Sequence, residues 1–74
     1  MILPKVDQFV SVCVYKNPLD YPNKYVARVF VGIEPTDQVV VEDTHEAIMK
    51  HKPEHMFAMD RKPNDHPNIL EVWI

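Results

Sequence analysis

The chain has 74 residues and a formal net charge of −3, with 46% hydrophobic and 26% charged residues. This composition is typical of one folded globular domain, which we expect to span residues 1–74. The negative charge argues against a dedicated nucleic-acid binder, because such proteins depend on cations that meet phosphates. The single glycine, Gly32, excludes a phosphate-binding loop, which needs several glycines.

Cysteine content and hydropathy indicate the compartment. The single cysteine, Cys13, rules out an intramolecular disulfide. We expect no signal peptide, because residues 1–8 do not have a charged leader followed by an apolar stretch. No apolar run approaches the about 18–20 residues that span a bilayer. The sequence therefore predicts a cytoplasmic protein with no membrane contact.

Two segments in the first half alternate between apolar and other residues, as half-buried strands do. They are Gln8–Tyr15 and Tyr25–Ile33, and both are rich in the β-branched and aromatic residues that suit a pleated sheet. Cys13 lies mid-strand between valines rather than at a turn or helix start, so we expect a small buried side chain and no nucleophile. The residues predicted to share one apolar face are Val10, Val12 and Val14, then Ala27, Val29, Val31 and Ile33.

The middle of the chain predicts a turn, a strand and one short helix. Residues 34–37 read as the turn and Gln38–Glu42 as the strand. Asp43 is expected to cap a helix from Thr44 to His51, with Glu46 completing a capping box. Pro53 cannot continue that helix. We expect Ala47, Ile48 and His51 to face the sheet, and Met49 and Lys50 to lie on the flanks.

The last part of the chain predicts two more strands, His55–Asp60 and Ile69–Ile74, joined by the turn-forming segment Arg61–Asn68. The final strand has apolar residues on both faces, which indicates an interior strand or one covered by a partner. There is no room for crossover helices. We therefore predict an α+β fold: a single, mainly antiparallel sheet of four or five strands, in the order β-β-β-α-β-β, with one short helix packed on one face.

The loop Lys16–Lys24 is the strongest candidate for a binding site. Three tyrosines surround it, two prolines restrict it, and binding surfaces favour preorganised tyrosines. The alternative is that Leu19 and the tyrosines fold back and cap a small core, and the sequence leaves both open. The candidate binding residues are Tyr15, Lys16, Tyr21, Lys24, Tyr25 and Arg28.

Other chemistry-bearing residues have structural explanations. His51 and His55 have the i, i+4 spacing of zinc-binding helices, but Pro53 lies between them, so we expect neither a metal site nor a cofactor. Five acidic residues between Glu34 and Glu46 occur without a Lys or Arg. They predict a solvated surface, with an acidic edge that meets a basic partner as the alternative. The remaining histidines, His45 and His66, complete no ligand set.

Three segments of the chain carry a resemblance: YKNPLDYPNKYVARVF, PTDQVVVEDTHEA and RKPNDHPNILEVWI. With them, the chain from about Tyr15 to Ile74 resembles small uncharacterised proteins of Firmicute genomes and of their phages and prophages. No activity, cofactor or catalytic residue is carried over from that group. The resemblance implies a context in which small phage-type proteins bind and modulate a host protein.

These observations lead to a ranked set of functional hypotheses. The first is a non-enzymatic protein-interaction module of the host-modulating or anti-defence kind, with an unidentified protein partner. A homodimer through a strand edge is compatible with it, because a sheet this small has two edges to protect. The second is a small nucleic-acid-binding regulator that uses the same loop. The third is a small metal-dependent hydrolase.

Overall fold

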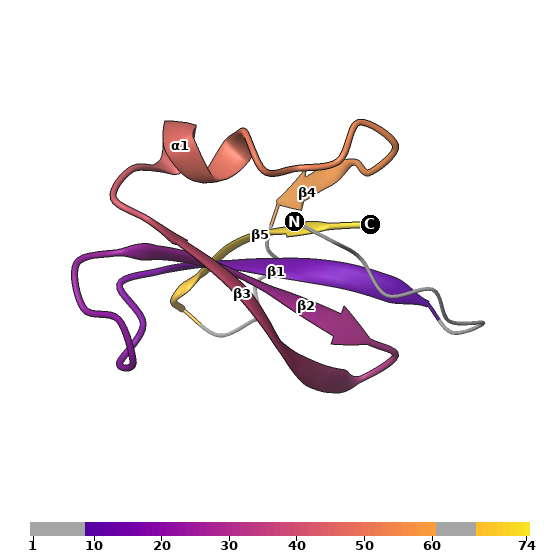
Figure 1. Ribbon diagram of the computed structural model, residues 1–74, viewed down its shortest axis with the longest axis horizontal. Helices are drawn as coiled ribbons and strands as arrows, with labels where there is room; N and C mark the ends of the chain where they lie inside the picture. The colour runs from indigo at the N-terminus through magenta and orange to yellow at the C-terminus, as the bar shows by residue number, and fades with distance from the viewer. Residues whose placement is uncertain (1–8, 61–66) are drawn as a thin grey trace.

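Five antiparallel strands form one sheet in the order β3-β2-β1-β5-β4. The computed structural model describes residues 9–60 and 67–74. One short helix and the segment after it cross one face of the sheet (Figure 1). The predicted α+β fold and its element order are confirmed. The elements are β1 (Val10–Lys16), β2 (Tyr25–Val31), β3 (Glu34–Glu42), α1 (His45–Met49), β4 (Ala58–Asp60) and β5 (Ile69–Trp73).

The turn between β2 and β3 lies earlier than the sequence suggested. Gly32 has a φ of 61° and, with Ile33, makes a turn that pairs Val31 with Glu34. Glycine adopts positive φ without a side-chain clash, which is why it directs a tight hairpin turn. The predicted turn at residues 34–37 is therefore wrong, because these residues belong to β3. A register shift between β2 and β3 follows this turn.

The helix α1 is shorter than predicted and has a different cap. The prediction that Asp43 caps it is wrong: Thr44 has an extended backbone, and its Oγ1 accepts the Ala47 N–H at 3.0 Å. Asp43 instead forms an ion pair with Lys24. The helix ends at Met49, before the predicted end at His51. The cap therefore satisfies one of the first backbone N–H groups of the helix, as threonine commonly does.

The core lies between α1 and the sheet. Ile48 is the one fully buried side chain of α1, and Met49 also packs against the core rather than lying on the flank as predicted. Strand β5 is an interior strand between β1 and β4, as its apolar residues on both faces predicted, and Trp73 is fully buried. The buried cluster comprises Val12, Val14, Ala27, Val29, Ile48, Met56 and Trp73.

A buried carboxylate joins the helix to the sheet. Glu71 of β5 is only 7% exposed, and its Oε2 accepts the Trp73 indole N–H at 2.7 Å. Its Oε1 lies 2.5 Å from Nε2 of His45, the first residue of α1. Beyond the other end of α1, His51 Nε2 lies 2.7 Å from a carboxylate oxygen of Glu42 in β3. Side-chain pairs therefore fix both ends of a helix that is too short to be stable alone.

The burial of Ile48 gives a stability prediction. Ile48→Ala removes the fully buried anchor of α1 and leaves a cavity, so we expect the free energy of unfolding to fall by about 2–5 kcal/mol. The measurement is urea denaturation followed by tryptophan fluorescence. Ile33→Ala is the matched control, because Ile33 is 90% exposed and the change there should stay within about 0.5 kcal/mol. Equal losses at both positions would contradict this description of the core.

The Glu71 network gives a second prediction. Glu71→Leu leaves the Trp73 indole N–H buried without its acceptor, so we expect a loss of about 1–3 kcal/mol. Glu71→Gln keeps an oxygen for that N–H and should lose less. Urea denaturation again provides the measurement, with Glu54→Leu at an exposed position as the control. A Leu variant as stable as the Gln variant would show that the hydrogen bond to the indole is unimportant.

Candidate functional site

The loop between β1 and β2 is held in one shape by its own hydrogen bonds. The Asn17 N–H donates to the Lys24 carbonyl at 2.8 Å, and the Asn17 side-chain oxygen accepts the Asn23 N–H at 2.8 Å. Inside the loop, Tyr21 N–H donates to the Pro18 carbonyl at 3.1 Å. Both asparagines have positive φ values, 54° and 64°, which asparagine tolerates better than most residues. The sequence of the loop thus specifies its conformation.

The end of the chain also supports this loop. Asn68, just before β5, accepts the Lys16 N–H on its carbonyl oxygen at 2.7 Å. Its side-chain amide donates to the Asn17 carbonyl at 3.1 Å. Segments far apart in the sequence therefore fix the base of the loop from both sides.

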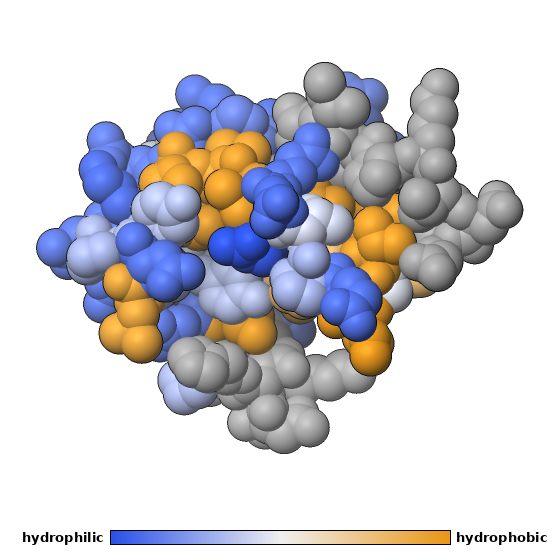
Figure 2. Space-filling model, turned by 60° about the horizontal axis from the view of Figure 1, so that its bottom comes forward, coloured by the Kyte–Doolittle hydropathy of each residue, from blue (hydrophilic) through white to orange (hydrophobic). Residues whose placement is uncertain are grey.

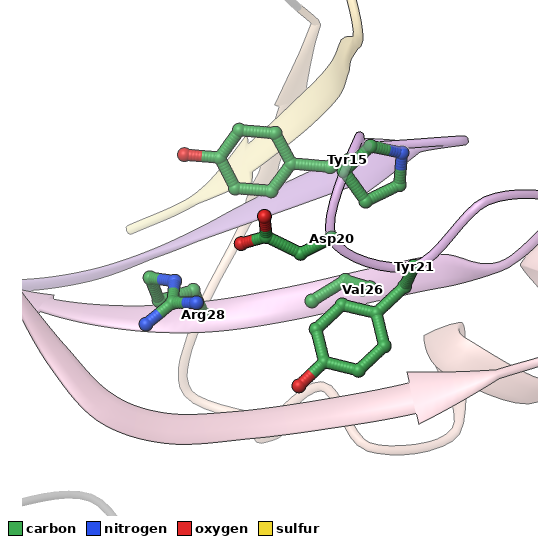
Figure 3. A pocket seen from close by; sticks show the side chains of 6 residues that line it. Tyr15, Asp20, Tyr21, Val26 and Arg28 are labelled. Atoms are coloured by element: carbon green, nitrogen blue, oxygen red, sulfur yellow. The ribbon is translucent and has the colours of Figure 1, made fainter.

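A hollow of about 210 Å³ opens beneath the loop, on the face of the sheet opposite α1. Figure 2 shows this side of the molecule, where apolar surface occurs in separate areas between polar side chains. In Figure 3 the Asp20 carboxylate lies between the ring of Tyr15 and the guanidinium of Arg28. Groups of both charges therefore line one small space. The residues around it are Tyr15, Pro18, Asp20, Tyr21, Val26 and Arg28.

Arg28 is fixed in this hollow by the irregular part of β3. Its Nη1 donates to the Thr36 carbonyl at 2.8 Å. The Thr36 hydroxyl in turn donates to the Val29 carbonyl at 2.7 Å and accepts the Gln38 N–H at 3.2 Å. The register shift between β2 and β3 thus turns a backbone carbonyl toward the arginine. One of the five N–H donors of the guanidinium is thereby fixed to the backbone of β3.

Tyr15 forms the wall of the hollow on β1. Burial raises the pKa of its hydroxyl above the ordinary value of 10.0, and a hydrogen bond and charge interaction with Cys13 raise it further. The positive charge of Arg28 acts in the opposite direction. Cys13 is half-buried on the same face of β1. Tyr15 is therefore a neutral phenol near neutral pH, able to donate or accept a hydrogen bond.

The structure divides the six predicted binding residues into two groups. Tyr15, Tyr21 and Arg28 line the hollow described above. The other three, Lys16, Lys24 and Tyr25, line a second hollow of about 270 Å³. Lys24 is engaged there by Asp43, and Tyr25 packs against the core and stacks on His45 with ring centroids 6.0 Å apart. Tyr25 thus supports the core, as one of the two predicted roles requires, whereas Tyr15 and Tyr21 line a surface hollow, and the binding role stays a prediction.

Sequence reasoning missed three residues of the first hollow, which are Pro18, Asp20 and Val26. The alternation in β2 carried a signal for Val26, because it places Val26 and Arg28 on one face. Asp20 lies in the middle of the loop, and only the fold of the loop shows that its carboxylate points into the hollow. Leu19 does not fold back as a cap, since it is 96% exposed.

Two of the histidines form side-chain pairs with acidic residues. His51 pairs with Glu42, and His45 pairs with Glu71. Within residues 9–60 and 67–74, no group of three His, Cys, Asp or Glu side chains is placed to hold a metal ion. His66 lies outside the described residues.

Neither the hydropathy of the described helix nor a comparison with known proteins points to a function. In the part of the chain that the structure describes, no helix is long and apolar enough to cross a bilayer. No protein-family model, curated protein or solved structure matches the chain. The resemblance to proteins of Firmicutes and their phages stays a prediction, and a functional assignment depends on the geometry of the loop and its hollow.

Tyr15 gives a prediction for alkaline titration. Since the pKa of Tyr15 is raised, one of the three tyrosines should ionise later than an exposed phenol, and Tyr15→Phe should remove that late step. The folded state resists ionisation, so this contribution to stability is present below pH 10 and is lost as pH rises above it. Phenolate absorbance measures the titration. Tyr21→Phe is the control, and loss of the late step in that variant instead would contradict the assignment.

Proposed function

We propose that the chain is a non-enzymatic protein-interaction module that binds its partner through the loop between β1 and β2. The observation that carries this proposal is the combination of an ordered loop with an almost fully exposed leucine. Leu19 is 96% exposed at a position flanked by internal hydrogen bonds, with Tyr21 beside it. An apolar side chain on a preorganised loop loses little conformational entropy on binding, which favours affinity.

The size of the hollow supports a protein partner. About 210 Å³ is below the usual range of about 300–1,000 Å³ for small-molecule sites, and suits one inserted side chain. The walls combine the tyrosine rings with one acidic residue, Asp20, and one basic residue, Arg28. Tyrosine and arginine are the residues that most often dominate protein–protein contacts. We therefore place the centre of the interface at this hollow, and Leu19 lies in the loop between two of its lining residues, Pro18 and Asp20.

Protein is favoured over nucleic acid as the partner because of the charges. A single-strand binder needs a positive groove along which bases stack. Here Lys24 is paired with Asp43, Tyr25 packs against the core, and the hollow that Arg28 lines is also lined by the acidic Asp20. A mobility-shift assay at low salt tests this alternative, and a shift that weakens steeply with salt would favour it over a protein partner. A host protein modulated by a phage-type factor is the partner that the resemblance implies.

The test is affinity capture from a Firmicute lysate, followed by binding measurements with the purified partner. Leu19→Asp and Tyr21→Ala should weaken binding by about tenfold or more, because they remove the exposed anchor and one wall of the hollow. Ile33→Asp is the matched control, at an exposed apolar residue of another turn, and should bind as the wild type does. Recovery of no partner, or equal binding by all variants, would remove this loop as the site.

A further inference from the structure

Strand β4 is an edge strand of the described sheet, and some of its backbone groups point away from that sheet. Phe57 and Ile74 exchange both backbone hydrogen bonds, at 2.8 and 3.0 Å. Because backbone groups alternate along a strand, those of Met59 also face β5. The N–H and C=O groups of Ala58 and Asp60 therefore face outward. No strand within the described residues pairs with this side of β4.

Three exposed apolar side chains lie next to this edge. Phe57 is 74% exposed, Met59 is 51% exposed and Ile74 is 43% exposed. Met59 pairs with Val72, so these side chains lie on the face of the sheet opposite α1. An exposed strand edge flanked by apolar side chains is a site where another strand adds to the sheet.

The charges of the two sheet edges indicate which one fits a second copy of the chain. The other edge strand, β3, carries Glu34, Asp37 and Glu42 and no Lys or Arg, so two copies paired there would oppose like charges. Pro35 and the register shift further interrupt that edge. In contrast, β4 carries a single charged residue, Asp60, at its end.

We propose that β4 pairs antiparallel with β4 of a second copy, about a two-fold axis at Met59. In this register Ala58 lies opposite Asp60 of the second copy, and each such pair exchanges both of its backbone hydrogen bonds. The two Met59 side chains meet at the axis, and Asp60 of one copy does not face Asp60 of the other. The sheets of the two copies then form one continuous sheet. A strand of three residues offers a small contact compared with the about 1,200–2,000 Å² of stable interfaces, so the dimer is concentration-dependent.

Sedimentation equilibrium of the full chain, from micromolar to millimolar concentration, tests this pairing. The apparent mass should rise from 8.7 kDa toward twice that value. Ala58→Pro removes only an outward N–H and leaves the β4–β5 ladder intact, so the variant should fold but associate at least about tenfold more weakly. Met59→Lys should also weaken association, because two like charges would meet at the axis.

The control is Ile33→Lys, which places the same charge at an exposed apolar position outside β4 and should associate as the wild type does. Circular dichroism establishes that each variant is folded, and Met59→Lys decides the test if Ala58→Pro does not fold. A monomer at every concentration overturns the proposal. So does association that survives a folded Ala58→Pro or Met59→Lys variant, or that Ile33→Lys weakens equally.

Discussion

The packing of helix α1 on the sheet depends on the contacts of the Glu71 carboxylate. It lies on the core-facing side of β5, where burial of a charged group without hydrogen-bonding partners costs free energy. Trp73 and His45 supply those partners, one from the sheet and one from the helix. A five-residue helix has little stability of its own, so its position is set by this pair, by the Glu42–His51 pair and by the burial of Ile48.

The architecture was predictable from the sequence because it follows from the alternation of apolar and other residues along the strands. Val10, Val12 and Val14 indicated the buried face of β1, and the apolar residues on both faces of Ile69–Trp73 indicated an interior strand. Boundaries were predicted less well. The chain reverses direction at Gly32 and not within the turn-forming residues 34–37. The residue with positive φ decides where the hairpin turn forms.

The candidate site was predictable only in outline. The loop composition identified Tyr15, Tyr21 and Arg28, which do meet around one hollow. The same reasoning included Tyr25, but strand parity places its ring on the α1 side, where it stacks on His45. Asp20 was missed because the direction of a loop carboxylate depends on the conformation of the loop, which no periodic pattern reveals.

The central position of β1 in the sheet determines the order in which strands can pair as the chain is translated. Its first neighbour, β2, follows after one short loop, but its second neighbour, β5, is the last strand described. While the chain emerges from the ribosome, the hairpin of β1 and β2 can form early, yet Trp73 reaches the core only after β2, β3, α1 and β4 have been synthesised. Until then the valines of β1 and β2 stay exposed to water and to other nascent chains. Pairing of strands this far apart in the sequence slows folding, and apolar strands that stay exposed meanwhile are prone to aggregate.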